Sequence, residues 1–367
     1  MNIENIVSPT LILDKKKCLN NIKLMAEKAK KHNLLFRPHF KTHQSRGIGK
    51  WFKKFGVNKI TVSSLQMAEY FSNDDWKDIT VAFPVNIREI ETINSLAEET
   101  QLNLTLENTE SVDLLTKELK FEVGFFIKID TGYGRTGVSF DIFQLIDNIL
   151  KLASISNKLI FKGFLSHAGN SYNAKNSDEI ITIHNDATHK LSLLKKQYID
   201  KYPELIISIG DTPSFSLADN FPGIDEIRPG NFVFYDLTQN NLGSCSFDQI
   251  ATILACPVVA KHKNRKEIII HGGGVHFSKE FLEINNNRTF GLFVKLNNKG
   301  WENTDQDFYL SKLSQEHGTL EVSEELFNEI NIGDLIGIIP IHSCLTANLM
   351  QEYLSLDDEI IDHFSGN

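Results

Sequence analysis

Charged and proton-accepting side chains are concentrated near the start of the chain, in the segment Arg-Pro-His-Phe-Lys-Thr-His. Within seven residues this segment holds Arg37, His39, Lys41, Thr42 and His43. Nearby positive charge and partial burial both disfavour an ammonium ion, and they lower the pKa of a lysine toward the range of a nucleophile. Lys41 is therefore a candidate catalytic lysine, with His39 as a second catalytic candidate. A solvated lysine at a helix start is the alternative.

Two turns further along the chain could bind a phosphate group. The first, Ser-Ile-Gly-Asp-Thr-Pro-Ser, offers Gly210, Thr212 and Ser214, and the second, Arg-Pro-Gly-Asn, offers Gly230 and Asn231. Backbone N–H groups and hydroxyls in such turns donate hydrogen bonds to phosphate oxygens. Ordinary loop chemistry explains either turn alone, but two such turns after successive strands favour a binding role.

A histidine and a cysteine near the C-terminus could bind a metal. In the segment Ile-Pro-Ile-His-Ser-Cys-Leu, His342 and Cys344 are two residues apart. We expect an extended segment here, which would place both side chains on one face. Imidazole and thiolate are suitable ligands for a zinc-like ion, and an incomplete protein shell leaves positions for a substrate. A buried cysteine beside a hydrogen-bonded histidine is the alternative.

Strand and helix patterns alternate through the first two thirds of the chain and predict what positions these residues. Apolar or β-branched runs occupy residues 34–37, 60–63, 79–83, 102–106, 124–129, 160–165, 205–209 and 227–232. Amphipathic stretches lie between most of them. Eight alternating units predict a TIM (β/α)8 barrel, whose site forms at the C-terminal ends of the strands. A doubly wound sheet is the competing fold, but its glycine-rich fingerprint is missing from the first turn. The candidate residues follow strands, and so do Arg135, His167 and Tyr172.

Short β-rich runs replace this pattern after about residue 240. They are separated by Asn, Gly and Asp clusters and indicate a mostly antiparallel β domain. We therefore expect a barrel over residues 15–240 and a β domain over residues 241–367. The first strand, within residues 1–14, is expected to join the β domain.

Composition narrows the classes of protein that the chain could represent. Of 367 residues, 41% are hydrophobic, and 38 Lys and Arg against 47 Asp and Glu give a net charge of −9. A net-negative chain without a long basic run is a poor nucleic-acid binder. We expect neither a membrane span nor an export signal. The four cysteines include no Cys-x-x-Cys pair, and such reduced thiols are typical of a cytoplasmic protein.

Six motifs that follow one another along nearly the whole chain resemble a known family. They are RPHFKTH, DTGYGRTG, RPGNFVFYD, GGGVHFSKE, SQEHG and IHSCLTANLM. Together they resemble the D-threonine aldolase and eukaryotic-type D-serine dehydratase family, within the alanine-racemase-like pyridoxal-phosphate enzymes. The resemblance implies a TIM barrel that binds pyridoxal 5'-phosphate, a C-terminal β domain and a homodimer. Gln44 departs from the pattern, because many relatives have a basic residue there.

The resemblance also implies roles for individual residues. Lys41 matches the lysine that forms a Schiff base with the cofactor, and Arg135 matches an arginine near the cofactor's phenolic oxygen. His342 and Cys344 match the ligands of a divalent metal, with zinc favoured and manganese or magnesium as alternatives. The residues that match the phosphate cradle are Gly210, Thr212, Ser214, Gly230 and Asn231. The residues expected to hydrogen-bond cofactor or substrate are His167 and Tyr172.

The implied reaction is elimination from a D-3-hydroxy amino acid to a keto acid and ammonia, with D-serine as the leading substrate. Cys344 resembles the dehydratase branch, since aldolases more often carry Asp at this position. The alternatives are retro-aldol cleavage, as in D-threonine aldolase, and a racemase that needs no metal. A non-catalytic cofactor carrier and a metal-only hydrolase are disfavoured.

Overall fold

The computed structural model describes residues 1–304 and 306–366. It divides into two compact units, and we describe each by itself. The sheet unit comprises residues 1–21, 42–48 and 233–365, and the barrel unit comprises most of the remainder, residues 22–41 and 49–232. No helix of these described residues is long and apolar enough to cross a membrane.

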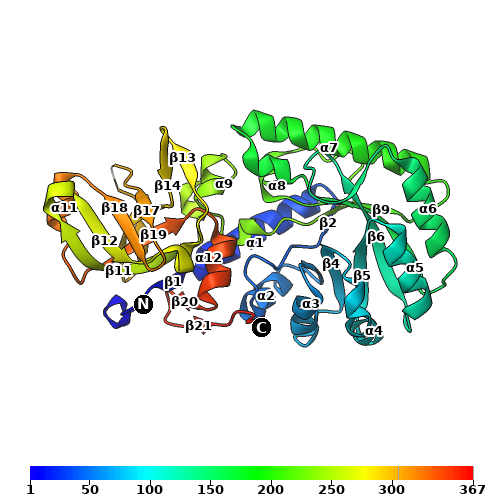
Figure 1. The fold of residues 1–367 in the computed structure, drawn as a ribbon, viewed down its shortest axis with the longest axis horizontal. Helices are drawn as coiled ribbons and strands as arrows, with labels where there is room; N and C mark the ends of the chain where they lie inside the picture. Colours follow the sequence, from blue (N-terminus) through cyan, green and yellow to red (C-terminus); the bar gives the residue numbers. More distant parts are fainter. Residues whose placement is uncertain (305, 367) are drawn as a thin grey trace. The chain divides into compact units, whose positions relative to one another are not determined.

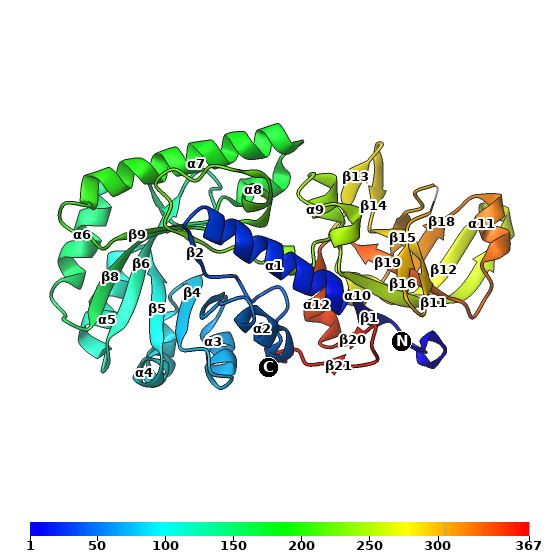
Figure 2. The same cartoon turned by 180° about the vertical axis from the view of Figure 1, so that it is seen from behind.

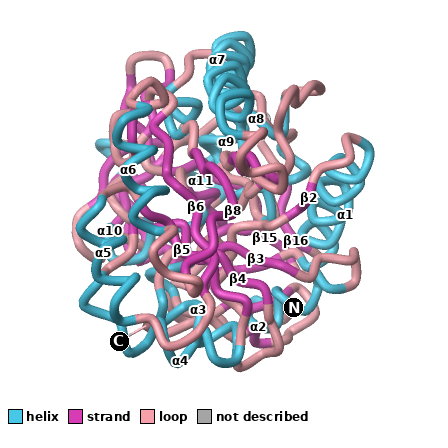
Figure 3. Tube along the Cα trace, turned by 90° about the vertical axis from the view of Figure 1, so that its right-hand side faces the viewer, coloured by secondary structure: helices cyan, strands magenta, loops and turns pink. Residues whose placement is uncertain are grey.

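The barrel unit is built on eight parallel strands, as predicted. Their order around the sheet is β2-β10-β9-β8-β6-β5-β4-β3. A short parallel bridge between His39 and Thr61 nearly closes the ring, because it joins the segment after β2 to β3. Figure 3 shows β4, β5, β6 and β8 at the centre, with α3, α4, α5 and α6 outside them. The strands span Leu35–Phe36 (β2), Lys59–Val62 (β3), Asp78–Pro84 (β4), Gln101–Leu106 (β5), Val123–Asp130 (β6), Val138–Ser139 (β7, beside β6), Leu159–Ser166 (β8), Ile206–Ile209 (β9) and Glu226–Ile227 (β10).

The helices of this unit cover the outer face of the barrel. The longest of them, α7, begins after Asn176, whose side chain accepts a hydrogen bond from the Glu179 amide. One side of α7 is buried through Ile180, Leu191 and Leu194, so an amphipathic stripe holds it on the barrel. Figure 1 shows α3 to α7 following the strands in sequence order. Helices of the whole chain span Lys15–Lys31 (α1), Arg46–Lys53 (α2), Leu65–Ser72 (α3), Ile90–Glu99 (α4), Thr109–Glu118 (α5), Phe143–Ala153 (α6), Ser177–Tyr198 (α7), Thr212–Leu217 (α8), Leu237–Asn241 (α9), Gly274–Phe277 (α10), Glu324–Glu329 (α11) and Ser343–Met350 (α12).

The sheet unit is mostly antiparallel, also as predicted. Its main path runs β16-β15-β19-β11-β1-β20-β21 (Figure 2). A branch leaves this path at β11, which pairs with β12; β12 pairs with β18, and β18 pairs with β17. The first strand, β1, pairs antiparallel with β11 and parallel with β20. The strands span Thr10–Leu13 (β1), Thr252–His262 (β11), Glu267–His271 (β12), Leu282–Ile284 (β13), Asn287–Thr289 (β14), Gly291–Asn297 (β15), Gly300–Glu302 (β16), Leu310–Leu313 (β17), His317–Glu321 (β18), Leu335–Pro340 (β19), Tyr353–Ser355 (β20) and Ile360–Ile361 (β21).

One predicted strand is much shorter than expected. Residues 227–232 were expected to be a strand, but β10 ends at Ile227 and a 3-10 turn spans Asn231–Val233. Pro229 has no N–H to donate to a neighbouring strand, which ends the ladder there. The break leaves Arg228, Gly230 and Asn231 in a loop at the end of the barrel.

Candidate active site

Lys41 lies at the end of the barrel where the ring closes. The preceding residue, Phe40, packs inward against Phe52, Phe71 and Trp76, with ring centroids 5.0 Å apart in each pair. The Phe40 amide donates to the Thr61 carbonyl at 2.8 Å, which fixes the backbone at the bridge. Lys41 itself is exposed, so the partial burial expected for it is not observed.

Two imidazoles next to Lys41 are held in the neutral form. Burial and the charges of Lys41 and Arg228 lower the pKa of His39 well below its ordinary value. Burial and the charge of Lys41 lower the pKa of His167 to about 3. His167 is also fixed through its Nδ1, which bonds the Gly210 carbonyl. Both rings can therefore accept or donate single hydrogen bonds here without adding charge.

Several positively charged side chains gather at this end of the barrel. Burial and the charges of Arg135 and Arg228 lower the pKa of Lys128 to about 8. Burial lowers the pKa of Arg228 to about 10, although Glu226 opposes the shift. Part of each shift comes from neighbouring positive groups, so an anionic group would be favoured here. The barrel end therefore fits a phosphorylated, anionic cofactor.

Three predicted cofactor-binding residues are joined by hydrogen bonds although they come from three loops. The Thr212 amide donates to the Tyr172 hydroxyl at 3.3 Å. The Gly230 amide donates to Thr212 Oγ1, also at 3.3 Å. The neighbouring Gly210 packs closely against Arg228, since an added Cβ would lie 3.0 Å from it. Asn231, the residue after Gly230, is also buried. The two turns predicted from the sequence thus form one polar cradle.

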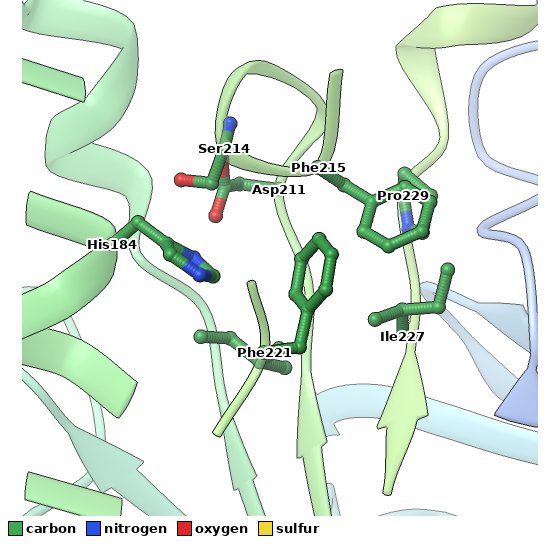
Figure 4. A pocket seen from close by; sticks show the side chains of 8 residues that line it. His184, Asp211, Ser214, Phe215, Phe221, Ile227 and Pro229 are labelled. Carbon is green, nitrogen blue, oxygen red and sulfur yellow. The ribbon is translucent and has the colours of Figure 1, made fainter. Parts of the chain in front are cut away.

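Ser214 belongs to the same turn but faces elsewhere. Its amide donates to Asp211 Oδ1 at 2.7 Å, which caps helix α8. Its side chain lines a small cavity with His184, Phe221 and Ile227 (Figure 4). Ser214 Oγ is buried without a hydrogen-bond partner among the residues that the structure describes. These contacts link Ser214 to this cavity and not to Thr212 or Gly230.

Arg135 lies in a glycine-rich turn that a single carboxylate organises. Asp130 Oδ1 accepts hydrogen bonds from the amides of Gly132 and Tyr133, each at 2.9 Å, and from Gly134 at 3.1 Å. The guanidinium of the exposed Arg135 lies 5.0 Å from the Tyr133 ring. Its charge contributes to the lowered pKa values of His167 and Lys128, so Arg135 faces the same polar cluster.

Arg37, which the sequence pattern groups with the basic residues of the site, has a structural role instead. Its side chain is 5% exposed and forms ion pairs with Glu226 and Asp78. Glu226 lies in β10, the strand beside β2, and Asp78 lies in β4, so the charge of Arg37 is neutralised inside the ring. Its type and spacing in the sequence could not reveal these two partners.

The metal-binding candidates lie in the sheet unit, where β19 gives way to helix α12. The extended segment expected for them is wrong beyond His342, because His342 occupies the N-cap position of α12 and Cys344 lies in its first turn. The two side chains nonetheless hydrogen-bond each other. Burial alone would lower the pKa of His342, but Cys344 and Glu280 raise it well above its ordinary value. His342 Nδ1 lies 2.8 Å from Glu280 Oε2, and Cys344 Sγ lies 3.2 Å from Thr42 Oγ1. An imidazole and a thiol that interact in this way fit a borderline-soft divalent cation.

A carboxylate distant in sequence determines where α12 begins. Asp236 Oδ2 accepts hydrogen bonds from the Ser343 amide at 3.0 Å and the Ser343 hydroxyl at 3.2 Å. Its other oxygen accepts from the Gln239 amide at 3.0 Å and caps α9. One side chain thus fixes two helix starts, and through the second it sets the position of Cys344.

Sequence reasoning missed Lys128, Asp236 and Glu280. Lys128 lies in an apolar strand, and its position inside the barrel was the only available signal. Asp236 and Glu280 lie in the motifs RPGNFVFYD and GGGVHFSKE, but their partners are 107 and 62 residues away in the chain. Only the folded structure brings these pairs together.

Comparisons with known proteins agree with this fold. Residues 13–237 match the family description "Alanine racemase, N-terminal domain", and residues 251–356 match "Putative serine dehydratase domain". D-serine dehydratase of Dictyostelium discoideum is 30% identical over 100% of this chain and 98% of its own. The structure matches a metal-free mutant of D-threo-3-hydroxyaspartate dehydratase with a TM-score of 0.92, at 22% identity and 99% coverage of both chains. The unmutated enzyme is from Delftia sp. HT23. D-threonine aldolase from Filomicrobium marinum matches with a TM-score of 0.80, at 20% identity over 98% and 96% of the two chains.

The closed parallel barrel and its lysine-bearing end define an alanine-racemase-like enzyme. Within that class, the chain belongs to the D-threonine aldolase and D-serine dehydratase family and is an enzyme of this family. Enzymes of this family depend on pyridoxal phosphate. The resemblance stated from the six sequence motifs is thereby confirmed.

Proposed function

We propose that the chain is a pyridoxal-phosphate- and divalent-metal-dependent lyase that eliminates water from a D-3-hydroxy amino acid, most readily D-serine. Net conversion of D-serine yields pyruvate and ammonia. The observation that carries the choice of elimination is the hydrogen-bonded pair of His342 and Cys344, because a cysteine at this place resembles the dehydratase branch.

The residues of the barrel would hold the cofactor and move the Cα proton. Lys41 would hold the cofactor, and after the substrate displaces it, its free amine would take the proton from Cα. Tyr172, Thr212 and Gly230 would bind the phosphate, and Arg135 would face the phenolic oxygen. When bound, pyridoxal phosphate supplies the electron sink for the pair left at Cα. His39 and His167 would stay neutral and orient neighbouring groups.

The residues of the sheet unit would hold the metal. His342 and Cys344 are its proposed ligands, with zinc favoured over manganese or magnesium. The ion supplies Lewis acidity that lets the β-hydroxyl leave. With these two protein ligands, the ion would remain open to that hydroxyl, as a catalytic metal must be to its substrate.

Aldol cleavage is the second candidate reaction. Relatives of the chain include D-threonine aldolase as well as dehydratases, and both reactions would use the same lysine, cofactor and metal. They differ in whether the Cα–H bond or the Cα–Cβ bond breaks. An amino-acid racemase, which would need no metal, is a third reading.

We also infer a homodimer that acts on a small D-amino acid in the cytoplasm. All four cysteines are free and buried, which is compatible with a reducing compartment. The net charge of −9 disfavours a nucleic-acid partner. Gel filtration with light scattering tests the dimer directly, and a monomer at micromolar concentration would contradict it.

The deciding experiment assays the purified protein with D-serine, D-threonine and D-3-hydroxyaspartate, before and after chelation. We expect pyruvate and ammonia from D-serine, with the rate lost on chelation and restored by added Zn²⁺. Glycine and acetaldehyde from D-threonine as the main products would replace the proposal with aldolase activity. Racemisation that persists after chelation would replace it with a racemase.

A further inference from the structure

Among the described residues of the sheet unit, two clusters combine histidine with glutamate. The cluster with more potential metal ligands is not the proposed metal site. His271, His276 and Glu316 offer three ligand atoms within 4.8 Å of one another. Glu316 Oε2 lies 3.8 Å from His271 Nε2 and 3.9 Å from His276 Nε2. The proposed site has only His342 and Cys344. Ligand number alone would therefore favour the three-residue cluster.

The two clusters differ in the hydrogen bond that the Nδ1 atom makes in His276 and in His342. His276 Nδ1 accepts a hydrogen bond from the Gly273 amide at 3.1 Å. A neutral imidazole that accepts at Nδ1 carries its proton on Nε2, so the nitrogen facing Glu316 has no lone pair for a cation. His342 has the opposite arrangement. Its Nδ1 lies 2.8 Å from Glu280 Oε2, and a carboxylate only accepts, so Nδ1 carries a proton and Nε2 is the nitrogen that a cation can bind once it displaces any proton there.

The backbone around His276 keeps it in this state. The Gly272 and Gly274 amides donate to the carbonyls of Glu316 and Ser314, at 2.9 and 2.8 Å. A Cβ at Gly273 would lie 2.4 Å from the Gln315 carbonyl oxygen, so the two segments are in close contact. The Gly273 amide is thus held toward His276, and releasing it would require moving two packed segments.

The thiol of the proposed site has its own partner. Thr42 is fully buried, and its hydroxyl oxygen lies 3.2 Å from Cys344 Sγ. A thiolate has no proton to donate, so in the deprotonated form the Thr42 hydroxyl donates to the sulfur. Thr42 also directly follows Lys41 in the sequence.

We propose that Glu280 and Thr42 are positioning residues for a single divalent cation, one for each protein ligand, and that the His271, His276 and Glu316 cluster binds none. Glu280 holds the His342 ring with Nε2 available to the cation, and Thr42 orients the Cys344 sulfur. Outer partners of this kind typically change metal affinity by about 10- to 100-fold. This inference rests on the metal site of the proposed function.

The test measures Co²⁺ binding to the full-length, cofactor-loaded, metal-depleted protein by competition with a chromophoric chelator. The sulfur-to-cobalt charge-transfer band reports ligation by Cys344. We expect one Co²⁺ per chain, about 10- to 100-fold weaker binding in Glu280→Ala, and partial recovery in Glu280→Gln, whose amide oxygen still accepts. Thr42→Val should weaken binding and shift the band, whereas Thr42→Ser should restore both.

Matched controls separate the possible failures. Glu283→Ala removes an exposed carboxylate three residues from Glu280, and Glu316→Ala removes the carboxylate of the other cluster. Both should bind one Co²⁺ with unchanged affinity.

If His342→Ala and Cys344→Ala also bind normally, the metal site of the proposed function is wrong. If they lose binding while Glu280→Ala and Thr42→Val do not, only this inference is wrong. Two Co²⁺ per chain, reduced to one by Glu316→Ala, would overturn the assignment of the other cluster.

Discussion

Glu226 Oε2 accepts a hydrogen bond from Arg37 Nε at 2.8 Å inside the barrel, where the carboxylate is fully buried. Its other oxygen accepts from the Ser208 hydroxyl at 2.8 Å, and Ser208 Oγ accepts from Arg228 Nε at 2.8 Å. One carboxylate therefore connects two buried arginines, and the second of them borders the cofactor cradle. The pair belongs to strands β10 and β2, which follow each other at the closure of the ring.

Glu226→Gln should destabilise the protein by about 3–5 kcal/mol, because it leaves the buried charge of Arg37 with one partner fewer. Urea unfolding monitored by circular dichroism measures the change. Glu91→Gln is the matched control, since Glu91 forms an exposed ion pair with Lys120. It should leave the unfolding midpoint unchanged. Equal midpoints for the two variants would contradict a structural role for Glu226.

Lys41→Ala should abolish the absorbance band at roughly 410–420 nm that a lysine-bound pyridoxal cofactor gives. Activity toward D-serine should disappear with it, because no other residue holds the cofactor covalently. Lys54→Ala, which removes an exposed lysine 13 positions further along, should keep both. A variant at Lys41 that retains the band and the rate would show that the central assignment is wrong.

Lys128→Met should stabilise the fold at pH 7, on the order of 1–3 kcal/mol. The pKa of Lys128 is lowered to about 8 by burial and by Arg135 and Arg228, so its charge is unfavourable in the folded state. Between pH 8 and the ordinary lysine pKa the unfolded chain binds more protons, so the wild type gains stability as pH rises. The advantage of the variant should therefore shrink toward pH 10.5. Chemical unfolding at pH 7, 8.5 and 10 tests this, and a variant less stable at pH 7 would contradict it.

Gly163→Ala should destabilise the barrel by at least about 2 kcal/mol or prevent folding. Gly163 has φ +140°, and an added Cβ would lie 1.9 Å from the Ile206 carbonyl oxygen. The site coincides with a register shift between β6 and β8. Gly56→Ala is the control, since its φ of +78° is also positive but nothing lies within 4 Å. Soluble yield and thermal midpoint compare the two, and similar losses would mean that crowding at β8 is not the cause.

Most strands of the barrel could be predicted from the sequence, because each is a short apolar run between helical stretches. Strand ends that depend on hydrogen bonding were less accurate, as β10 shows at Pro229. In the sheet unit, strand β11 contains Pro257. Pro257 is tolerated because β1 pairs with β11 only up to Ala255 and β12 only from Val258.

Residue types and spacing identified the candidate ligands but not the local structure that positions them. The pattern around His342 and Cys344 favours an extended segment, whereas the structure has a helix start there. The cap that creates this start is Asp236, 107 residues earlier in the chain. The same limitation applies to Glu280 and to the ion pairs of Arg37, since long-range partners leave no local signal.

The closure of the ring by β2 has a consequence for folding kinetics. This strand contributes only Leu35–Phe36 to the sheet, and Arg37 beside it must find Glu226 across 189 positions of the chain. Pairing over such a distance carries a large loop-closure entropy and a high contact order, so it forms after local βα units. The segment that carries Lys41 is therefore fixed at a late step of folding. Cofactor capture would report the completion of the barrel, and the amide protons at the bridge between His39 and Thr61 should exchange with solvent before those of β6 and β8.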